Sequence, residues 1–218
     1  ITSRLPSWRN DRLWPSAITR SSTSSSPCST SGWPGGRAVL RSTRSFDEFA
    51  ALLAHEGVQR TVDVRKLTGS RRFPQFNADA LAPALHACGV GYQHIAALGG
   101  RRGRTLAKGE SSPNGYWTNE SFRRYADYAL TQDFAAGMAE LREASQATRC
   151  AVMCAEAVWW RCHRRIITDY LLLEGREVLH ILGKAHAEPA SMTSGAEPTT
   201  LVGQPDRTAL IYPSAVQR

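Results

Sequence analysis

Residues 151–171 have the sequence AVMCAEAVWWRCHRRIITDYL, which passes from a short apolar run through a turn into an amphipathic helix. The turn gathers two cysteines, a carboxylate, a histidine and three arginines. These are Cys154, Glu156, Arg161, Cys162, His163, Arg164 and Arg165. No other stretch of the sequence holds so many nucleophilic or anion-binding side chains. A strand that ends in such a turn before a helix indicates an α/β fold whose functional residues follow the strands.

Strand and helix patterns alternate on both sides of this segment. Strands are expected at 38–40, 58–64, 90–95, 149–154 and 177–182, and helices between Ser45 and Gly57, between Asn77 and Gly89, over 119–147 with a break near Thr131, and over 160–174. Each strand is short and apolar without strict alternation, which favours a parallel sheet covered on both faces. We therefore expect a single three-layer α/β/α domain of Rossmann-like type with a mostly parallel sheet.

The domain is expected to span residues 38–183. Residues 1–37 are dominated by Ser, Arg, Pro and Trp, which predicts a disordered segment or, because the chain starts at Ile1 rather than Met, a misassigned one. Residues 184–218 are polar and rich in proline, so we expect a C-terminal extension with one short closing element at 209–212.

The net charge of +8 is concentrated near the N-terminus. Residues 1–44 hold seven arginines and one acid, a balance of +6, and the remaining residues carry only +2. The basic total is therefore a weak argument for a nucleic-acid-binding surface on the folded part. No apolar run has the length of a membrane span, no signal peptide is apparent, and five cysteines form no disulfide framework. These features predict a cytoplasmic protein with reduced thiols and no membrane association.

Ligands of parallel α/β sheets bind where the strands end, so polar residues there are the candidate site. Asp63 and Arg65 follow one predicted strand, His94 ends the next, and residues 98–118 form a long loop. The expected catalytic residues are Cys154, Glu156, Asp63 and His94. The expected binding residues are Arg65, Ser70, Gly99, Gly100, Arg101, Arg161, His163 and Arg164.

Cys154 is the central residue of this prediction, because a thiol near a helix N-terminus and arginines is biased toward the nucleophilic thiolate. The alternative is that Cys154 and Cys162 fill the core as small apolar residues. Glu156 and Asp63 are candidates for acid/base chemistry or for binding sugar hydroxyls, and ion pairs with neighbouring arginines are the alternative. His94 is a candidate proton shuttle, or else a histidine hydrogen-bonded to the backbone.

Three functions follow as hypotheses. The first is an enzyme that acts on a phosphorylated or nucleotide-like small molecule through Cys154 or Glu156, with arginines binding the anion. The second is a non-catalytic nucleic-acid-binding module that uses Arg65, Arg71, Arg72, Arg101, Arg102 and Arg104. The third is a metal site of Cys154, Cys162 and His163, which a helix starting at 160 disfavours because adjacent helical residues point about 100° apart. The sequence indicates no particular cofactor.

Four blocks of the sequence resemble a known family. They are DVR at 63–65 with SRRFPQFN at 70–77, YQH at 92–94 with LGG at 98–100, YWTNESFRRYADY at 116–128, and CAE at 154–156 with WRCHR at 160–164. Together they are similar to the domain-of-unknown-function 488 family over about residues 42–183. The resemblance implies a compact three-layer α/β domain and no established activity. The chain departs from the family pattern at 40–43, where LRST replaces Gly-His-Ser-Thr, and at Trp159, where proline is common.

Overall fold

The computed structural model describes residues 36–39, 44–107, 109–156, 158–183, 186–201 and 203–214. The predicted disordered segment therefore lies almost entirely outside the described residues, as do residues 40–43. The elements in chain order are β1 Gly36–Val39, α1 Phe46–His55, β2 Arg60–Asp63, α2 Ala78–Ala87, β3 Gly91–His94, α3 Glu120–Ala129, α4 Gln132–Ala144, β4 Cys150–Met153, α5 Arg164–Leu173, β5 Val178–Gly183, β6 His186–Pro189, β7 Glu197–Leu201 and β8 Gln204–Ile211. Single 3-10 turns occur at Pro74–Phe76, Ala96–Leu98 and Trp159–Arg161.

The strands form a mostly parallel sheet in the order β3-β2-β4-β1-β5-β6. β1 to β5 all run parallel to one another, and only β6 is antiparallel, to β5. β7 and β8 pair separately as an antiparallel hairpin. Because β2, β3 and β4 run in the same direction, their carboxyl ends lie at one edge of the sheet, which is the edge where the sequence predicted the site.

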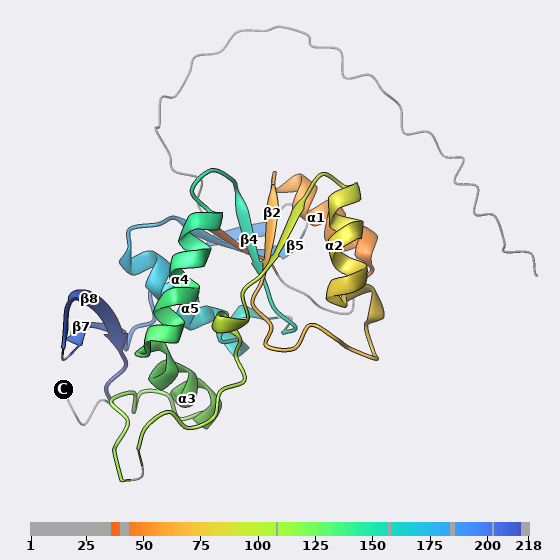
Figure 1. Cartoon of the computed structure of the whole chain (residues 1–218). Coiled ribbons are helices and arrows are strands. Elements are labelled where there is room, and N and C mark those ends of the chain that lie inside the picture. Colours follow the sequence, from red (N-terminus) through yellow and green to blue (C-terminus); the bar gives the residue numbers. More distant parts are fainter. Residues whose placement is uncertain are drawn as a thin grey trace, which may run out of the picture. The chain divides into compact units, whose positions relative to one another are not determined.

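The apolar residues of β4 show that both faces of the sheet are buried. Ala151 and Met153 belong to a cluster with Phe49 of α1 and Leu81 of α2. Cys150, Val152 and Cys154 point the other way, into a cluster that includes residues of α3, α4 and α5. Figure 1 shows α1 and α2 on one side of the strands and α4 and α5 on the other. A strand buried on both faces is apolar without alternation, so the predicted mixed α/β fold is confirmed.

Two predicted helix boundaries are confirmed in atomic detail. At α1 the Glu48 N–H donates to the Ser45 hydroxyl at 3.2 Å, and the Ser45 N–H donates to the Glu48 carboxylate at 2.8 Å. This is the reciprocal capping box that the sequence indicated. The long helical stretch also breaks as expected, because Thr131 caps α4 and accepts a hydrogen bond from the Phe134 N–H at 3.4 Å.

The helix predicted over 160–174 begins four residues later than expected. Trp159–Arg161 form a 3-10 turn, Cys162 has extended backbone angles, and α5 starts at Arg164. Trp159 stacks on His180 of β5 with ring centroids 4.0 Å apart, and its indole N–H donates to Glu188 of β6 at 3.3 Å. These contacts hold the turn against the sheet and outweigh the local helical pattern. Cys162 and His163 are therefore not successive residues of a helix, so the 100° separation does not apply.

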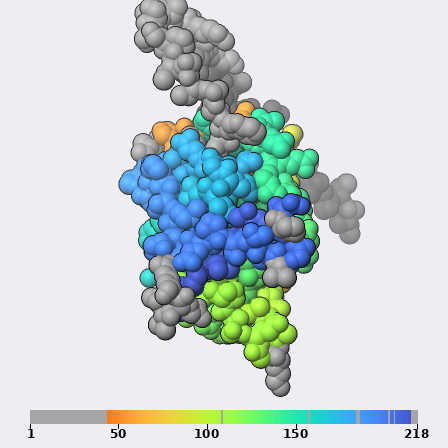
Figure 2. All heavy atoms as spheres, turned by 90° about the vertical axis from the view of Figure 1, so that its left-hand side faces the viewer, coloured from red at the N-terminus to blue at the C-terminus, as the bar shows by residue number. Residues whose placement is uncertain are grey.

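The C-terminal extension holds more structure than one closing element. The residues at 209–211 end β8, whose partner β7 was not predicted, and β6 also joins the main sheet. Every second residue of β7 is exposed, and polar strands of this kind carry little apolar signal. The hairpin lies on the surface beside the 101–118 loop (Figure 2), where the Tyr116 N–H donates to the Tyr212 carbonyl at 2.9 Å.

Among the helices that the structure describes, none combines the length and the apolar character needed to cross a bilayer.

Candidate functional site

A cavity of about 760 Å³ opens beyond the ends of β2 and β4. Eight of the twelve predicted site residues line it: Arg65, Ser70, Gly100, Arg101, Cys154, Glu156, Arg161 and His163. The other four, Asp63, His94, Gly99 and Arg164, do not line it. Segments distant in the sequence thus converge at one edge of the sheet.

The wall of this cavity is strongly cationic. Six basic side chains line it, and Glu156 is the single acid among its described lining residues. Three of the cations, Lys66, Arg101 and Arg161, are exposed. Such a concentration of positive charge in a recess favours an anionic ligand.

Two of the remaining cations already have intramolecular partners. The Arg102 guanidinium donates to the Gly99, Ala96 and Ala97 carbonyls at 2.7, 2.8 and 2.6 Å, and lies 3.7 Å above the Tyr128 ring. Arg124 forms an ion pair with Glu120. These residues shape the wall, whereas the exposed cations remain accessible to a bound anion.

Two cysteines and a histidine meet at the base of the cavity. The Cys154 Sγ lies 3.8 Å and the Cys162 Sγ 3.6 Å from the Nδ1 of His163. Both cysteines are buried, and His163 is half-buried. Cys154 directly follows β4, whereas Cys162 and His163 immediately precede α5, so the extended backbone at Cys162 is what brings the second sulfur to the first.

The imidazole of His163 is fixed from three sides. Its Nε2 lies 3.3 Å from the Val64 carbonyl, which can only accept, so Nε2 carries a proton and Nδ1 faces the two sulfurs. The Tyr125 ring packs edge-on against it at 4.9 Å between centroids. A Cβ at Gly100 would lie 2.3 Å from Nδ1, so only glycine allows this approach.

A buried arginine controls the charge on the cysteine pair. The Arg164 Nε donates to the Cys162 Sγ at 3.2 Å, and its Nη2 donates to the Glu156 carbonyl at 2.9 Å. Burial acts to raise the pKa of Cys162, but the Cys154 hydrogen bond and the charge of Arg164 outweigh it and lower that pKa well below its usual range. The hydrogen bond to Cys162, together with burial, raises the pKa of Cys154. Each cysteine thus shifts the pKa of the other, in opposite directions.

The family model for the domain of unknown function DUF488 matches residues 45–171, more than half of the chain. The chain belongs to the DUF488 family. The matched range contains Cys154, Cys162 and His163 together with Gly100 and the exposed cations of the cavity. No curated protein and no protein of solved structure matches the chain.

In this DUF488 chain Asp63 and Arg65 form a buried ion pair. The Arg65 Nε donates to both carboxylate oxygens of Asp63, at 2.8 and 3.0 Å, and the Tyr92 hydroxyl donates to the same carboxylate at 2.8 Å. Asp63 is completely buried and lies outside the cavity wall. The arrangement is the ion pair that the sequence left open as an alternative to catalysis.

The remaining predicted residues of the DUF488 chain have local structural contacts. The His94 Nε2 donates to the Arg65 carbonyl at 2.7 Å. A Cβ at Gly99 would lie 2.8 Å from the backbone of Lys66, so this glycine permits close packing of two loops. The Ser70 hydroxyl accepts from the Phe73 N–H at 3.3 Å while Ser70 lines the cavity.

Sequence reasoning did not assign Lys66 or Tyr125 to the DUF488 site. Lys66 directly follows Arg65 after a predicted strand, and this position was the one feature of the sequence that could have assigned it to the site. Tyr125 is part of a helical apolar pattern that does not distinguish a residue packed on an imidazole from ordinary core. Val64 contributes only its carbonyl, which has no signal in the side-chain sequence.

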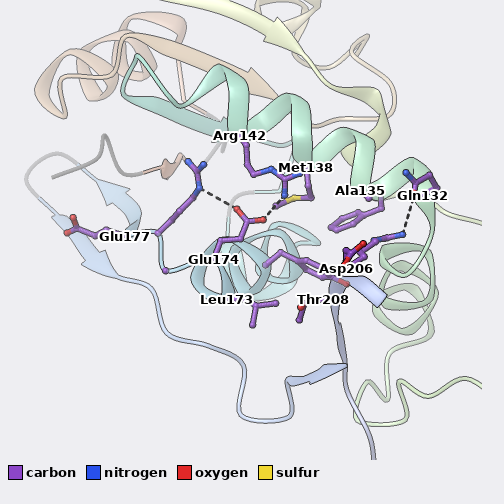
Figure 3. Close-up of a pocket in the computed structure, with 14 residues that line it drawn as sticks. Gln132, Ala135, Met138, Arg142, Leu173, Glu174, Glu177, Asp206 and Thr208 are labelled. Atoms are coloured by element: carbon purple, nitrogen blue, oxygen red, sulfur yellow. Dashed lines mark hydrogen bonds and ion pairs between the residues drawn. The ribbon is translucent and has the colours of Figure 1, made fainter. Parts of the chain in front are cut away.

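A second cavity of about 940 Å³ lies between α4, the end of α5 and β8 (Figure 3). Three of its charged residues pair with one another: Arg142 donates to Glu174 at 2.9 Å, and Arg176 lies 3.4 Å from the same carboxylate. None of its described lining residues is a cysteine or histidine. Although this cavity is larger than the cationic one, the two cysteines and the histidine line the cationic cavity.

Proposed function

We propose that this DUF488 chain is an enzyme that acts on a phosphorylated or nucleotide-like small molecule in the cationic cavity. One observation carries the proposal: a recess lined by six basic side chains and one acid has a thiol pair at its base. The volume of about 760 Å³ lies within the range of about 300–1,000 Å³ that small-molecule sites occupy. Reduced thiols fit a cytoplasmic location.

The fold supports the position of this site. The two apolar clusters on opposite faces of β4 support a single three-layer domain of Rossmann-like type. In such domains ligands bind beyond the carboxyl ends of the strands. The cavity occupies that position relative to β2 and β4.

In this proposal the exposed cations bind the anionic group of the ligand. The residues at the base and rim of the cavity carry out the reaction. Lys66, Arg101 and Arg161 bind the phosphate group of the ligand. Cys154, which lines the cavity, supplies the nucleophile, and the exposed Glu156 supplies acid/base chemistry at the rim.

Anion binding is tested by isothermal titration calorimetry of the full chain with adenosine monophosphate as the probe. Arg101→Ala and Arg161→Ala are each expected to weaken binding about tenfold, because one charge-assisted contact contributes about 1.5–3 kcal/mol. Arg71→Ala is the matched control, since Arg71 is exposed and does not line the cavity. Equal weakening by the control, or no binding of adenosine monophosphate, inorganic pyrophosphate or ribose 5-phosphate, would overturn the proposal.

Catalysis is tested by incubating the chain with a panel of phosphorylated metabolites and detecting converted products by mass spectrometry. Cys154→Ser and Glu156→Gln are expected to remove turnover while the melting temperature falls by less than about 4 °C. A large loss of melting temperature would instead assign Cys154 to the core.

The same titration distinguishes a nucleic-acid-binding module. Such a module would bind a single-stranded oligonucleotide far more tightly than the mononucleotide, with an affinity that falls steeply with salt. It would also lose affinity on Arg71→Ala as much as on Arg101→Ala. The internal bonds of Arg65 and Arg102 argue against this outcome.

A further inference from the structure

We infer that Cys154, Cys162 and His163 form a binding site for a thiophilic divalent cation of the zinc class, with one coordination position open to the cationic cavity. The inference goes beyond the proposed function and does not depend on it, because it stands on the positions of three donor atoms. In the part of the chain that the structure describes, this is the one group of three or more Cys, His or acidic residues with metal-binding geometry.

The distances between the donor atoms fit a tetrahedral cation. With metal–sulfur bonds of about 2.3 Å and metal–nitrogen bonds of about 2.0–2.1 Å, a tetrahedral angle separates sulfur from nitrogen by about 3.6 Å. The two Sγ atoms lie 3.8 and 3.6 Å from the His163 Nδ1. All three donor atoms lie within 4.8 Å of one another, so a cation fits among them with little rearrangement.

The groups around the donors are those of a metal site. Histidine ligands of metals usually donate their second ring N–H to a carbonyl or carboxylate. Here the His163 Nε2 donates to the Val64 carbonyl at 3.3 Å, and Nδ1 is the ring nitrogen that faces the sulfurs and would bind the cation. The Arg164 Nε donates to the Cys162 Sγ at 3.2 Å, as outer-shell donors do to ligating thiolates.

The open position faces the cavity because all three ligand residues line it. Structural zinc sites use four protein ligands, whereas catalytic sites use three and leave the fourth to water or substrate. A divalent cation held by two thiolates and a neutral imidazole has no net charge, and Arg164 adds one positive charge beside it. This balance favours an anionic oxygen of a bound molecule in the fourth position.

The experiment is a titration of the full chain with Co²⁺ alone, after treatment with a chelator and under a metal-free phosphine reductant. We expect one Co²⁺ per chain, a sulfur-to-cobalt charge-transfer band in the near ultraviolet, and the strong visible bands of tetrahedral Co²⁺. Zn²⁺ is expected to displace the Co²⁺ and remove these bands. Cys154→Ser, Cys162→Ser and His163→Gln are each expected to weaken binding by at least about 100-fold, because even outer-shell changes cost about 10- to 100-fold.

Matched controls come from the other cysteines. Cys88 is exposed on the far end of α2, and Cys150 donates to the Ala144 carbonyl at 3.1 Å, away from the cavity. Cys28→Ser, Cys88→Ser and Cys150→Ser should leave the stoichiometry and the spectrum unchanged. Circular dichroism of each variant reports folding, and the half-buried His163 keeps the test decisive if a cysteine variant unfolds.

Absence of the charge-transfer band in the folded parent chain would overturn the inference, as would unchanged affinity in folded Cys154→Ser or His163→Gln. The titration contains no phosphorylated molecule, so its failure leaves the nucleotide titration of the proposed function intact. Conversely, a chain that binds Co²⁺ without binding adenosine monophosphate would retain the metal site and lose the proposed substrate class.

Discussion

The substitution Asp63→Asn tests whether this carboxylate is structural. The Asp63 side chain is fully buried and Arg65 is 4% exposed, so the substitution leaves a guanidinium in the interior without its counter-charge. It also weakens the hydrogen bonds from Arg65 at 2.8 and 3.0 Å and from Tyr92 at 2.8 Å. Removing one partner of a buried ion pair costs about 3–5 kcal/mol. Since asparagine keeps some acceptor capacity, we expect about 3 kcal/mol.

The assay is equilibrium unfolding in urea, followed by circular dichroism. The urea midpoint should fall at an unchanged slope, and the melting temperature should fall by about 6–12 °C, at about 2–4 °C per kcal/mol for a chain of this size. Asp206→Asn is the control, because this aspartate is exposed on β8 and its loss should cost less than about 0.5 kcal/mol.

A second variant isolates the unpaired charge as the cause. Asp63→Leu combined with Arg65→Met removes both charges and should be less destabilised than Asp63→Leu alone. The reasoning is refuted if Asp63→Asn costs less than about 1 kcal/mol and abolishes turnover, since Asp63 would then be an accessible catalytic carboxylate.

Three further outcomes follow from the structure. Gly100→Ala should displace the His163 imidazole and weaken Co²⁺ binding about tenfold or more, because the new Cβ would lie 2.3 Å from Nδ1. Burial, followed by the charge of Arg164, lowers the pKa of His180 to about 4. The unfolded state therefore binds more protons below pH 6.5, and the free energy of unfolding should fall by up to about 3 kcal/mol between pH 6.5 and pH 4, a slope that His180→Leu removes. Arg102→Lys should cost about 1–3 kcal/mol and increase amide exchange in its loop, because lysine has one nitrogen and lacks the planar fork of Nε and Nη2 that reaches the three carbonyls.

The controls for these outcomes lie in the same segments. Gly103→Ala places its Cβ in open space and should leave Co²⁺ binding unchanged. Arg101→Lys changes an exposed guanidinium next to Arg102 and should leave amide exchange in the loop unaltered. If His180→Leu retained the full pH slope, other groups would be responsible for it.

The fold was predictable where burial dominates the choice of residue. The unbroken apolar sequence of β4 indicated a strand covered on both faces, and its residues do alternate between two clusters. The break at Thr131 followed from its capping hydroxyl. The polar β7 gave no comparable signal, because one of its faces is exposed.

For the candidate site, the sequence predicted that its residues converge beyond the strand ends, but not how the individual side chains are arranged. Residues that follow the strands converge as parallel topology requires, and eight of the twelve predicted site residues line one cavity. The predicted start of α5 was wrong because Trp159 packs on His180, and the sequence pattern does not show a contact between residues so far apart in the chain. Because of this error, the sequence did not predict that Cys162 lies close to Cys154. Whether Asp63 paired with Arg65 or faced a ligand also depended on packing, which the sequence pattern leaves open.

The contact between His163 and the Val64 carbonyl has a consequence for how the family can diverge. Any residue at position 64 supplies the same main-chain oxygen, so mutation there alters the strand without altering the orientation of the ring. Position 100 has no such freedom, because any side chain would collide with the ring. Val64 is fully buried in the core, so substitutions at 64 should be limited to apolar residues that fit there, whereas only glycine is expected at 100. A library randomised at both positions and selected for cobalt retention would return several apolar residues at position 64 and glycine at position 100.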